Sequence, residues 1–281
     1  MGKFEGFYVR TTDTDNSVAV IFGRNKARGA RSSFIQVITA EKTYNAVFDY
    51  ADWAVTKKPF SVSIGGNRAS VDGLVLDFAV DEVNIKAELS FGAFTPIKGD
   101  AMGFFRFFPF MECKHCVVSM AHSVSGRVSI DEKTIDFDGA NGYIEGDRGK
   151  SFPRKYFWSQ SDQPNVMVSA ARIPYLGVRF VGTICIVRHE GREYRLATYR
   201  GARVKVFDED RLVVKQGKKL LEVTVPDVEL NRRDLFAPDR GKMNRIIRET
   251  VTTTVRYKFS IKGVVVFDVT SDVAAYEWSR V

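Results

Sequence analysis

The sequence predicts an all-β protein built from two antiparallel β units. Short segments rich in β-branched and aromatic residues recur along the chain, Gly, Asp and Asn separate them, and the 3.6-residue periodicity of helices is scarce. A chain of 281 residues is long enough for two cores or for one continuous β architecture. The Pro-, Gly- and Phe-rich stretch 91–111 is the best candidate boundary, which gives units at 1–110 and 111–281.

In the first half, strands are expected at 16–22, 33–39 and 60–64, which are short, β-branched or aromatic, and bounded by turn residues. Residues 83–91 alternate apolar and polar side chains, which is the pattern of a strand with one buried and one solvent-exposed face. The same signals in the second half predict strands at 166–170, 178–187, 193–199, 203–207 and 220–225.

Two long strands are expected at the end of the chain, at 250–261 and 264–269, with Lys262-Gly263 as a tight hairpin turn. One short helix is expected at 239–249, where Met243, Ile246 and Ile247 fall on one side.

The composition is that of a folded globular protein, with 44% hydrophobic and 27% charged residues. The chain holds 22 Phe, which fill a core or line an apolar cavity. The net charge of +8 suits an anionic partner, but the basic residues are spread along the chain and interleaved with acids. A solvated basic surface is the simpler interpretation, and no nucleic-acid-binding motif is present.

The sequence favours a cytoplasmic protein with no stable membrane insertion. The amino terminus has no long apolar segment of a secretory signal, and the strongly apolar stretch 102–111 is too short to cross a bilayer. The 3 cysteines are too few for a disulfide framework, which fits a reducing compartment.

Cys113, His115, Cys116 and His122 suggest a metal site, but a structural zinc site usually needs two cysteine pairs. On a strand, Cys113 and His115 share one face and the other two share the opposite face. We therefore expect no metal.

Residues 138–160 contain the densest group of chemically active side chains. Glycines between 139 and 149 surround Glu145, Asp147 and Arg148, and Tyr156, Phe157 and Trp158 follow. One interpretation is a ligand or catalytic site; the other is a structural turn in which Arg148 neutralises one of the acids. The glycine spacing does not match a nucleotide-binding loop.

Residues 109–122 and 142–158 resemble the tocopherol cyclase family, in particular its bacterial members of unassigned substrate. The resemblance extends to Gly6-Phe-Tyr, to 33–38, to Phe94-Thr-Pro and to 237–243, and so covers nearly the whole chain. Cys116 departs from it, because a glycine is expected there. No plastid-type transit peptide precedes these segments, which favours a bacterial source.

This resemblance implies two lipocalin-like (calycin-like) β-barrel or sandwich units that hold a hydrophobic small molecule. It also implies an intramolecular lyase or isomerase activity without cofactor, in which a prenylated quinol closes to a chromanol. Because a fold does not fix a function, two alternatives stay open: a non-catalytic carrier of a hydrophobic ligand, and a structural protein without a small ligand.

Ring closure requires an acid that stays protonated at neutral pH, and burial among apolar groups raises the pKa of a carboxyl group in this way. Glu145 or Asp147 is the candidate proton donor, with Glu112 as a substitute. His115 is the candidate acceptor of the phenol proton, or the group that holds the acid's proton in place.

Four further residues are candidate substrate contacts. The rings of Trp158 and Tyr156 are suited to stabilising a carbocation, and Phe152 supplies an apolar wall beside the acid. Arg148 is suited to orienting a carboxylate or a substrate oxygen.

Overall fold

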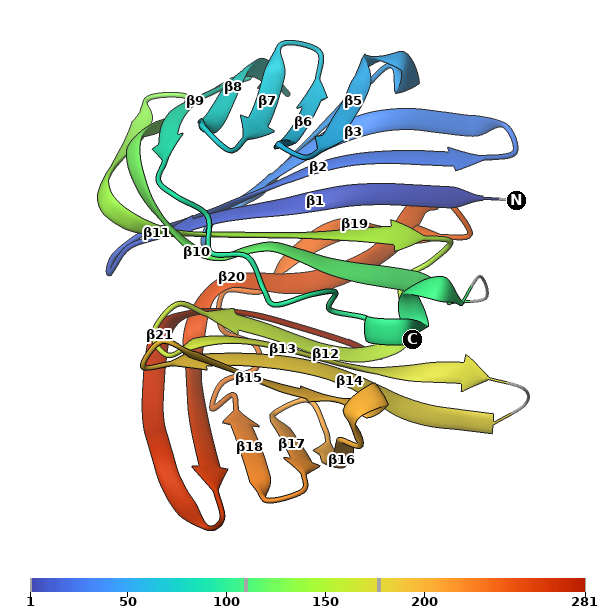
Figure 1. Cartoon of the computed structure of the whole chain (residues 1–281). Coiled ribbons are helices and arrows are strands. Elements are labelled where there is room, and N and C mark those ends of the chain that lie inside the picture. Colours follow the sequence, from blue (N-terminus) through green and yellow to red (C-terminus); the bar gives the residue numbers. More distant parts are fainter. Residues whose placement is uncertain (1, 109–110, 176–177, 281) are drawn as a thin grey trace. The chain divides into compact units, whose positions relative to one another are not determined.

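The computed structural model describes residues 2–108, 111–175 and 178–280. The described residues form strands and three short 3-10 helices, with no α-helix among them. The strands make two large antiparallel sheets, which confirms the predicted fold class (Figure 1).

The chain folds as two units. The first comprises Met1–Ile97, Glu112–Phe152 and Leu235–Ile246, and the second comprises Lys98–Met111, Pro153–Asp234 and Ile247–Val281. This division differs from a single boundary at residue 110. The Phe-rich stretch does end one run of strands, but the chain then adds two more strands to the first sheet before the second begins.

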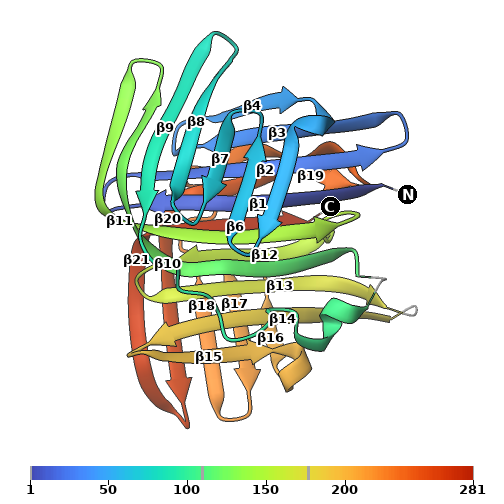
Figure 2. The same ribbon diagram turned by 45° about the horizontal axis from the view of Figure 1, so that its top comes forward.

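The first sheet has eleven strands in the order β4-β3-β2-β1-β11-β10-β9-β8-β7-β6-β5. Their bounds are β1 (Lys3–Thr12), β2 (Ser17–Ala27), β3 (Ala30–Ile38), β4 (Thr43–Phe48), β5 (Trp53–Lys57), β6 (Phe60–Ile64), β7 (Asn67–Ser70), β8 (Gly73–Val80), β9 (Val83–Phe91), β10 (Cys113–Ile130) and β11 (Lys133–Gly149), with the 3-10 helix η1 (Tyr50–Asp52) before β5. In Figures 1 and 2, β5–β9 lie across from β1–β3, so the sheet curls over one of its own faces.

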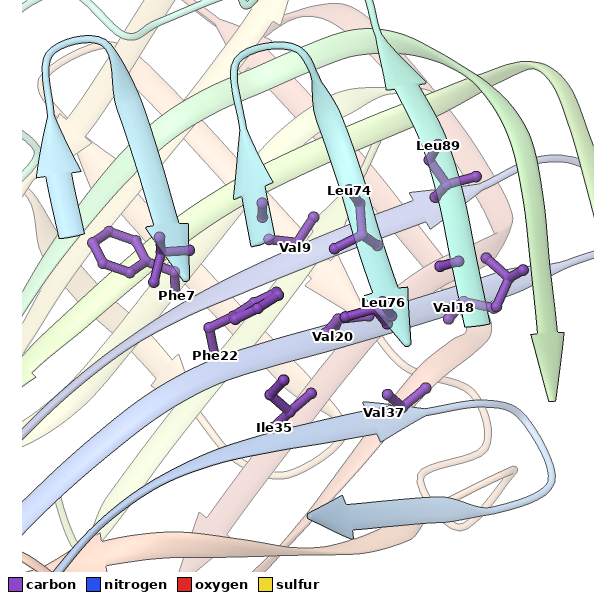
Figure 3. Packing of buried hydrophobic residues seen from close by; sticks show 14 of the residues in the cluster. Phe7, Val9, Val18, Val20, Phe22, Ile35, Val37, Leu74, Leu76 and Leu89 are labelled. Carbon is purple, nitrogen blue, oxygen red and sulfur yellow. The ribbon is translucent and has the colours of Figure 1, made fainter. Parts of the chain in front are cut away.

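The core of the first unit lies inside this curl. Figure 3 shows Val9 and Phe22 from β1 and β2 on the same side as Leu74 and Leu76 from β8. These side chains are buried, and ring contacts such as Phe7 with Phe60, at 5.2 Å between centroids, continue the packing. Burial of this apolar surface is the main driving force that holds the curled sheet together.

The second sheet follows the order β15-β14-β13-β12-β21-β20-β18-β17-β16, with β19 paired to β20. Its strands are β12 (Lys155–Ser161), β13 (Asn165–Tyr175), β14 (Val178–His189), β15 (Arg192–Ala197), β16 (Arg203–Phe207), β17 (Arg211–Gln216), β18 (Lys219–Thr224), β19 (Arg233–Asp239), β20 (Lys242–Ile261) and β21 (Val264–Arg280). The 3-10 helices η2 (Gly103–Phe107) and η3 (Thr198–Arg200) complete the unit. Its own core is built around Phe157, Tyr257 and Phe259.

The predicted strands are confirmed, except that the strand expected at 193–199 ends at Ala197, directly before η3. Those at 60–64 and 83–91 have the expected bounds as β6 and β9. The Lys262-Gly263 hairpin is also confirmed: both residues have positive φ, 54° and 80°, as a type I′ turn requires. The helix expected at 239–249 is wrong. Arg240 and Gly241 form a turn with φ of 51° and 78°, and the apolar residues beyond it belong to the long strand β20.

The glycine-rich block at 138–149 is part of strand β11 and is not a turn. Its glycines permit close approach of neighbouring groups. A Cβ atom at Gly146 would lie 2.6 Å from the ring of Phe7, and one at Gly149 would lie 1.9 Å from the backbone oxygen of Glu112. The absence of side chains at these two glycines therefore leaves room for groups that lie close to β11.

We predict that Gly149→Ala lowers the free energy of unfolding by about 1–3 kcal/mol, because the backbone of Glu112 must shift to admit the methyl group. Gly66→Ala is the matched control, since nothing lies within 4 Å of a Cβ atom at that position. Denaturant unfolding of both variants measures the difference. Equal stability of the two variants would contradict the close approach described for Gly149.

Candidate functional site

A row of polar side chains lies on the face of β11 opposite the core. Ile144 belongs to the core cluster and Gly146 packs against Phe7, so alternation turns Tyr143, Glu145 and Asp147 to the other face. Tyr143 and Glu145 are nevertheless buried, and Asp147 is partly exposed. The row is thus a set of ionisable groups largely withdrawn from water.

His115 joins this row from the neighbouring strand β10, where it faces Asp147 in register. Its Nδ1 atom lies 3.2 Å from Oδ1 of Asp147, and its Nε2 atom lies 3.5 Å from Oε2 of Glu145. The thiol of Cys113 also donates a hydrogen bond to Oδ1 of Asp147, at 3.3 Å. One imidazole ring therefore sits between two carboxyl groups, and we call His115, Glu145 and Asp147 the His-acid cluster.

Two neutral donors complete the surroundings of the His-acid cluster. The hydroxyl group of Tyr143 donates a hydrogen bond to Oε2 of Glu145 at 2.5 Å. Burial, together with the nearby Glu145 charge and the hydrogen bond to it, raises the pKa of Tyr143 well above its usual range. Burial and the nearby Asp147 raise the pKa of Cys113 in the same way. Both groups therefore stay protonated at neutral pH.

Strand β1 adds residues to the same face that sequence analysis missed. Tyr8 faces Glu145 in register, and Arg10 faces Tyr143. Arg10 is fully buried and donates a hydrogen bond to the hydroxyl oxygen of Ser17 at 3.3 Å. A buried guanidinium is unusual in a strand, and its charge opposes that of the acids on β11. The pairing of β1 with β11, strands more than 100 residues apart, is not visible in the sequence.

The other predicted site residues of the first unit are placed differently. Arg148 is exposed, and alternation turns it to the face opposite Glu145 and Asp147. Glu112 precedes β10, and its backbone oxygen accepts a hydrogen bond from the backbone amide of Lys150 at 2.7 Å. Phe152 packs edge-on against Phe4, with 5.3 Å between ring centroids. The structure therefore brings together His115, Glu145 and Asp147 and does not bring Arg148 to them.

Tyr156 and Trp158 belong to the second unit, on strand β12, on the face opposite its core residue Phe157. Both are buried, and the Tyr156 hydroxyl group donates a hydrogen bond to Glu277. Glu277 in turn faces Glu249 in register, and both acids are buried. Sequence analysis missed these two acids, although Glu277 stands out as a charge between Tyr276 and Trp278.

The metal donors that the structure gathers are not those that the cysteine spacing suggested. Donor atoms of His115, Glu145 and Asp147 lie within 4.8 Å of one another, whereas Cys116 is exposed and on the other face from His115. Imidazole and carboxylate are common ligands of divalent metals. The two ring nitrogens of His115 face different acids: Nδ1 lies within hydrogen-bonding distance of Asp147, and Nε2 lies 3.5 Å from Glu145. The expectation of no metal requirement stays a prediction, and elemental analysis of protein purified without chelator tests it.

His122 lies on the core face of β10, away from the His-acid cluster. Its Nδ1 atom is 3.1 Å from the hydroxyl group of Ser119, and the rings of Phe91 and Phe94 lie 4.7 Å from its own. It faces Gly142, where a Cβ atom would lie 2.2 Å from Nε2. Burial lowers the pKa of His122 to about 4, so this ring is neutral at pH 7. His122 is a packed core residue.

The described residues include no helix with the length and apolar character needed to cross a membrane. The sequence profile of the tocopherol cyclase-like family matches residues 77–278. A comparison with curated proteins gave no match.

Solved structures share the fold at low sequence identity. Kievitone hydratase from Nectria haematococca is 12% identical, with a TM-score of 0.54 over 99% of this chain and 89% of its own. CghA with Sch210972 is 10% identical, with a TM-score of 0.55 over 99% and 86% of the two chains. An AttH-type protein from Nitrosomonas europaea is 11% identical, with a TM-score of 0.52 over 99% and 92%. At these identities the likeness concerns the fold.

We predict that His122 makes the protein less stable as the pH falls. Its pKa is about 4 in the folded chain and near 6.5 in the unfolded chain, so the unfolded state binds the proton more tightly. This contribution is fully present above pH 6.5 and decreases toward pH 4, where about 3 kcal/mol is lost. Urea unfolding of His122→Leu and the parent at pH 7 and 4.5 measures it. A parallel loss of stability in both proteins would contradict the prediction.

Proposed function

Because this chain belongs to the tocopherol cyclase-like family, we propose that it binds a hydrophobic prenylated or polyene small molecule and catalyses its acid-promoted ring closure without a cofactor. The observation that carries the proposal is the position of His115 between Glu145 and Asp147, on a face that is largely withdrawn from water. Solved structures with the same fold include a hydratase, whose name denotes the addition of water, and CghA with a bound small molecule. Both names are consistent with small-molecule chemistry on this fold.

The reaction needs one proton delivered and one removed. Glu145, in its protonated form, gives its proton to the less substituted carbon of a trisubstituted alkene, and a tertiary carbocation forms. The phenol oxygen of the same molecule attacks that cation, a C–O bond closes the ring, and the phenol proton leaves. No electron is exchanged and no atom is gained or lost, so the reaction is an isomerisation.

The His-acid cluster supplies both proton steps. Asp147, paired with His115, is the base that takes the phenol proton, and His115 returns it to Glu145 over gaps of 3.2 and 3.5 Å. The Tyr143 hydroxyl group donates its hydrogen bond to the carboxylate that Glu145 becomes after it gives up its proton. Burial strengthens these electrostatic interactions, because little water screens them.

The alternative function is that of a carrier of a hydrophobic ligand, and the His-acid cluster separates the two proposals. A carrier needs an apolar surface and a few orienting hydrogen bonds, whereas three titratable groups in one relay are costly to bury. That cost favours catalysis. Native mass spectrometry of the purified protein identifies a retained lipophilic molecule under either proposal.

We predict that Asp147→Asn lowers turnover of a prenylated hydroquinone by at least about 100-fold, the usual contribution of a general acid or base. The amide keeps the size of the side chain, so the melting temperature should change little. Asp136→Asn is the matched control, because Asp136 lies on the same strand and forms an exposed ion pair with Arg127. Product formation by liquid chromatography and thermal unfolding are measured on the same samples.

A purely structural Asp147 gives a different result. The amide would then lower the free energy of unfolding by about 1–3 kcal/mol, through the weakened hydrogen bonds to His115 and Cys113, and any activity would persist in the folded fraction. Unchanged turnover by a folded Asp147→Asn protein would refute the role of this residue. Unchanged turnover by Glu145→Gln as well would refute the catalytic cluster.

A further inference from the structure

The loop that precedes β10 belongs to the second unit and has no part in the proposed chemistry. Residues 102–108, which we call the aromatic loop, contain four phenylalanines and one arginine around η2. Phe104 is 52% exposed and Phe107 is 71% exposed, so two large rings face solvent within one short turn. Side chains of this kind are costly to leave in water, and a cluster of them marks an interaction surface.

The aromatic loop is held in place by buried polar contacts. Arg195 is buried and donates hydrogen bonds to the backbone oxygens of Lys98 and Asp100, both at 2.8 Å. The Tyr199 hydroxyl group donates to the backbone oxygen of Ala101 at 3.0 Å, and the Tyr199 ring lies 6.2 Å from that of Phe104. Figure 2 shows η2 beside η3. The exposed rings therefore project from a fixed support.

Positive charge surrounds the exposed rings. Arg106 lies over the Phe107 ring, with 4.5 Å between the guanidinium carbon and the centroid. Arg200 follows Tyr199 and is exposed, and so is Lys98 at the start of the loop. Asp100 is the acid in residues 98–108, and it pairs with Arg106 at 3.7 Å. Glu193 also lies here, since its carboxylate accepts a hydrogen bond from the Lys98 amide and pairs with Arg195. Four cations against two acids give this surface the positive sign of the whole chain, whose net charge is +8.

We propose that the aromatic loop docks this protein reversibly on the surface of an anionic phospholipid bilayer. Aromatic rings partition into the boundary between headgroups and acyl chains, and nearby Arg and Lys side chains are attracted to anionic lipids. The two exposed rings contribute apolar partitioning, and the flanking cations contribute electrostatic attraction. Each contribution is weak, and together they give surface binding without insertion of a strand or helix. The proposal does not depend on ring closure, since docking requires no substrate.

Vesicle co-sedimentation tests the docking. We expect the full-length protein to bind vesicles of phosphatidylcholine with 30% phosphatidylserine several-fold more tightly than vesicles of phosphatidylcholine alone. We expect 0.5 M NaCl to reduce that binding. The double variant Phe104→Ser/Phe107→Ser should lower the partition coefficient at least ten-fold, and Arg106→Gln should lower it less and mainly for the anionic vesicles.

The matched control removes exposed apolar side chains elsewhere in the same unit. Val264 and Val265, at the β20–β21 hairpin, are 70% and 48% exposed, and Val264→Ser/Val265→Ser should change the partition coefficient less than two-fold. Circular dichroism and thermal unfolding establish that each variant is folded. Activity on a substrate dispersed in detergent should be equal in the parent and the Phe104→Ser/Phe107→Ser variant, which separates failure of docking from failure of the proposed function.

Three results would overturn the proposal. The parent protein fails to bind anionic vesicles, or the Phe104→Ser/Phe107→Ser variant binds them as well as the parent does. The third is a dimer in analytical ultracentrifugation that this variant abolishes, since a second copy of the chain would then be the partner of the aromatic loop.

Discussion

The two-residue alternation along β11 is the constraint on which the first unit and its candidate site both depend. From Ala140 to Asp147, every second residue of this central strand faces the apolar core, and the residues between them include the ionisable Tyr143, Glu145 and Asp147. A one-residue change of register would move Glu145 into the core and Ile144 to the polar face. The packing of Ile144 and Gly146 therefore fixes the position of Glu145 and Asp147, and the apolar core specifies the polar row.

The polar row is also where this fold departs from the most stable arrangement of its residues. Buried carboxyl groups, a buried guanidinium and two protonated donors carry a desolvation cost that apolar side chains would not. The contacts within the row offset part of that cost, as Tyr143 does for Glu145 and His115 for both acids. Such concentrations of costly groups are typical of functional sites, which is the physical reason for assigning chemistry to this face.

Local sequence patterns were sufficient for the fold class and for strands such as β6 and β9, because period-two alternation is a local property. They failed where one residue type has two structural uses. The glycines at 138–149 are consistent with a turn in the sequence, but in the structure they lie on β11 and leave room for Phe7, His122 and Glu112 beside it. In the site, alternation groups Tyr143 with the acids and excludes Arg148. Arg10 depends on the pairing of β1 with β11, two strands far apart in the chain. Glu249 and Glu277 are paired within the β20–β21 hairpin.

The first unit is assembled from three separate stretches of chain, and this has a consequence for synthesis on the ribosome. Gln36 is buried and exchanges two hydrogen bonds with the backbone of Phe236, and Asn25 donates another to Gly241. Those partners lie 200 and 216 residues farther along the chain. The side-chain amides of Gln36 and Asn25 therefore lack these partners while the second unit is still being made, and contacts of such long sequence separation form slowly. For this protein, the first unit is completed only after residues 153–234 of the second unit have been synthesised.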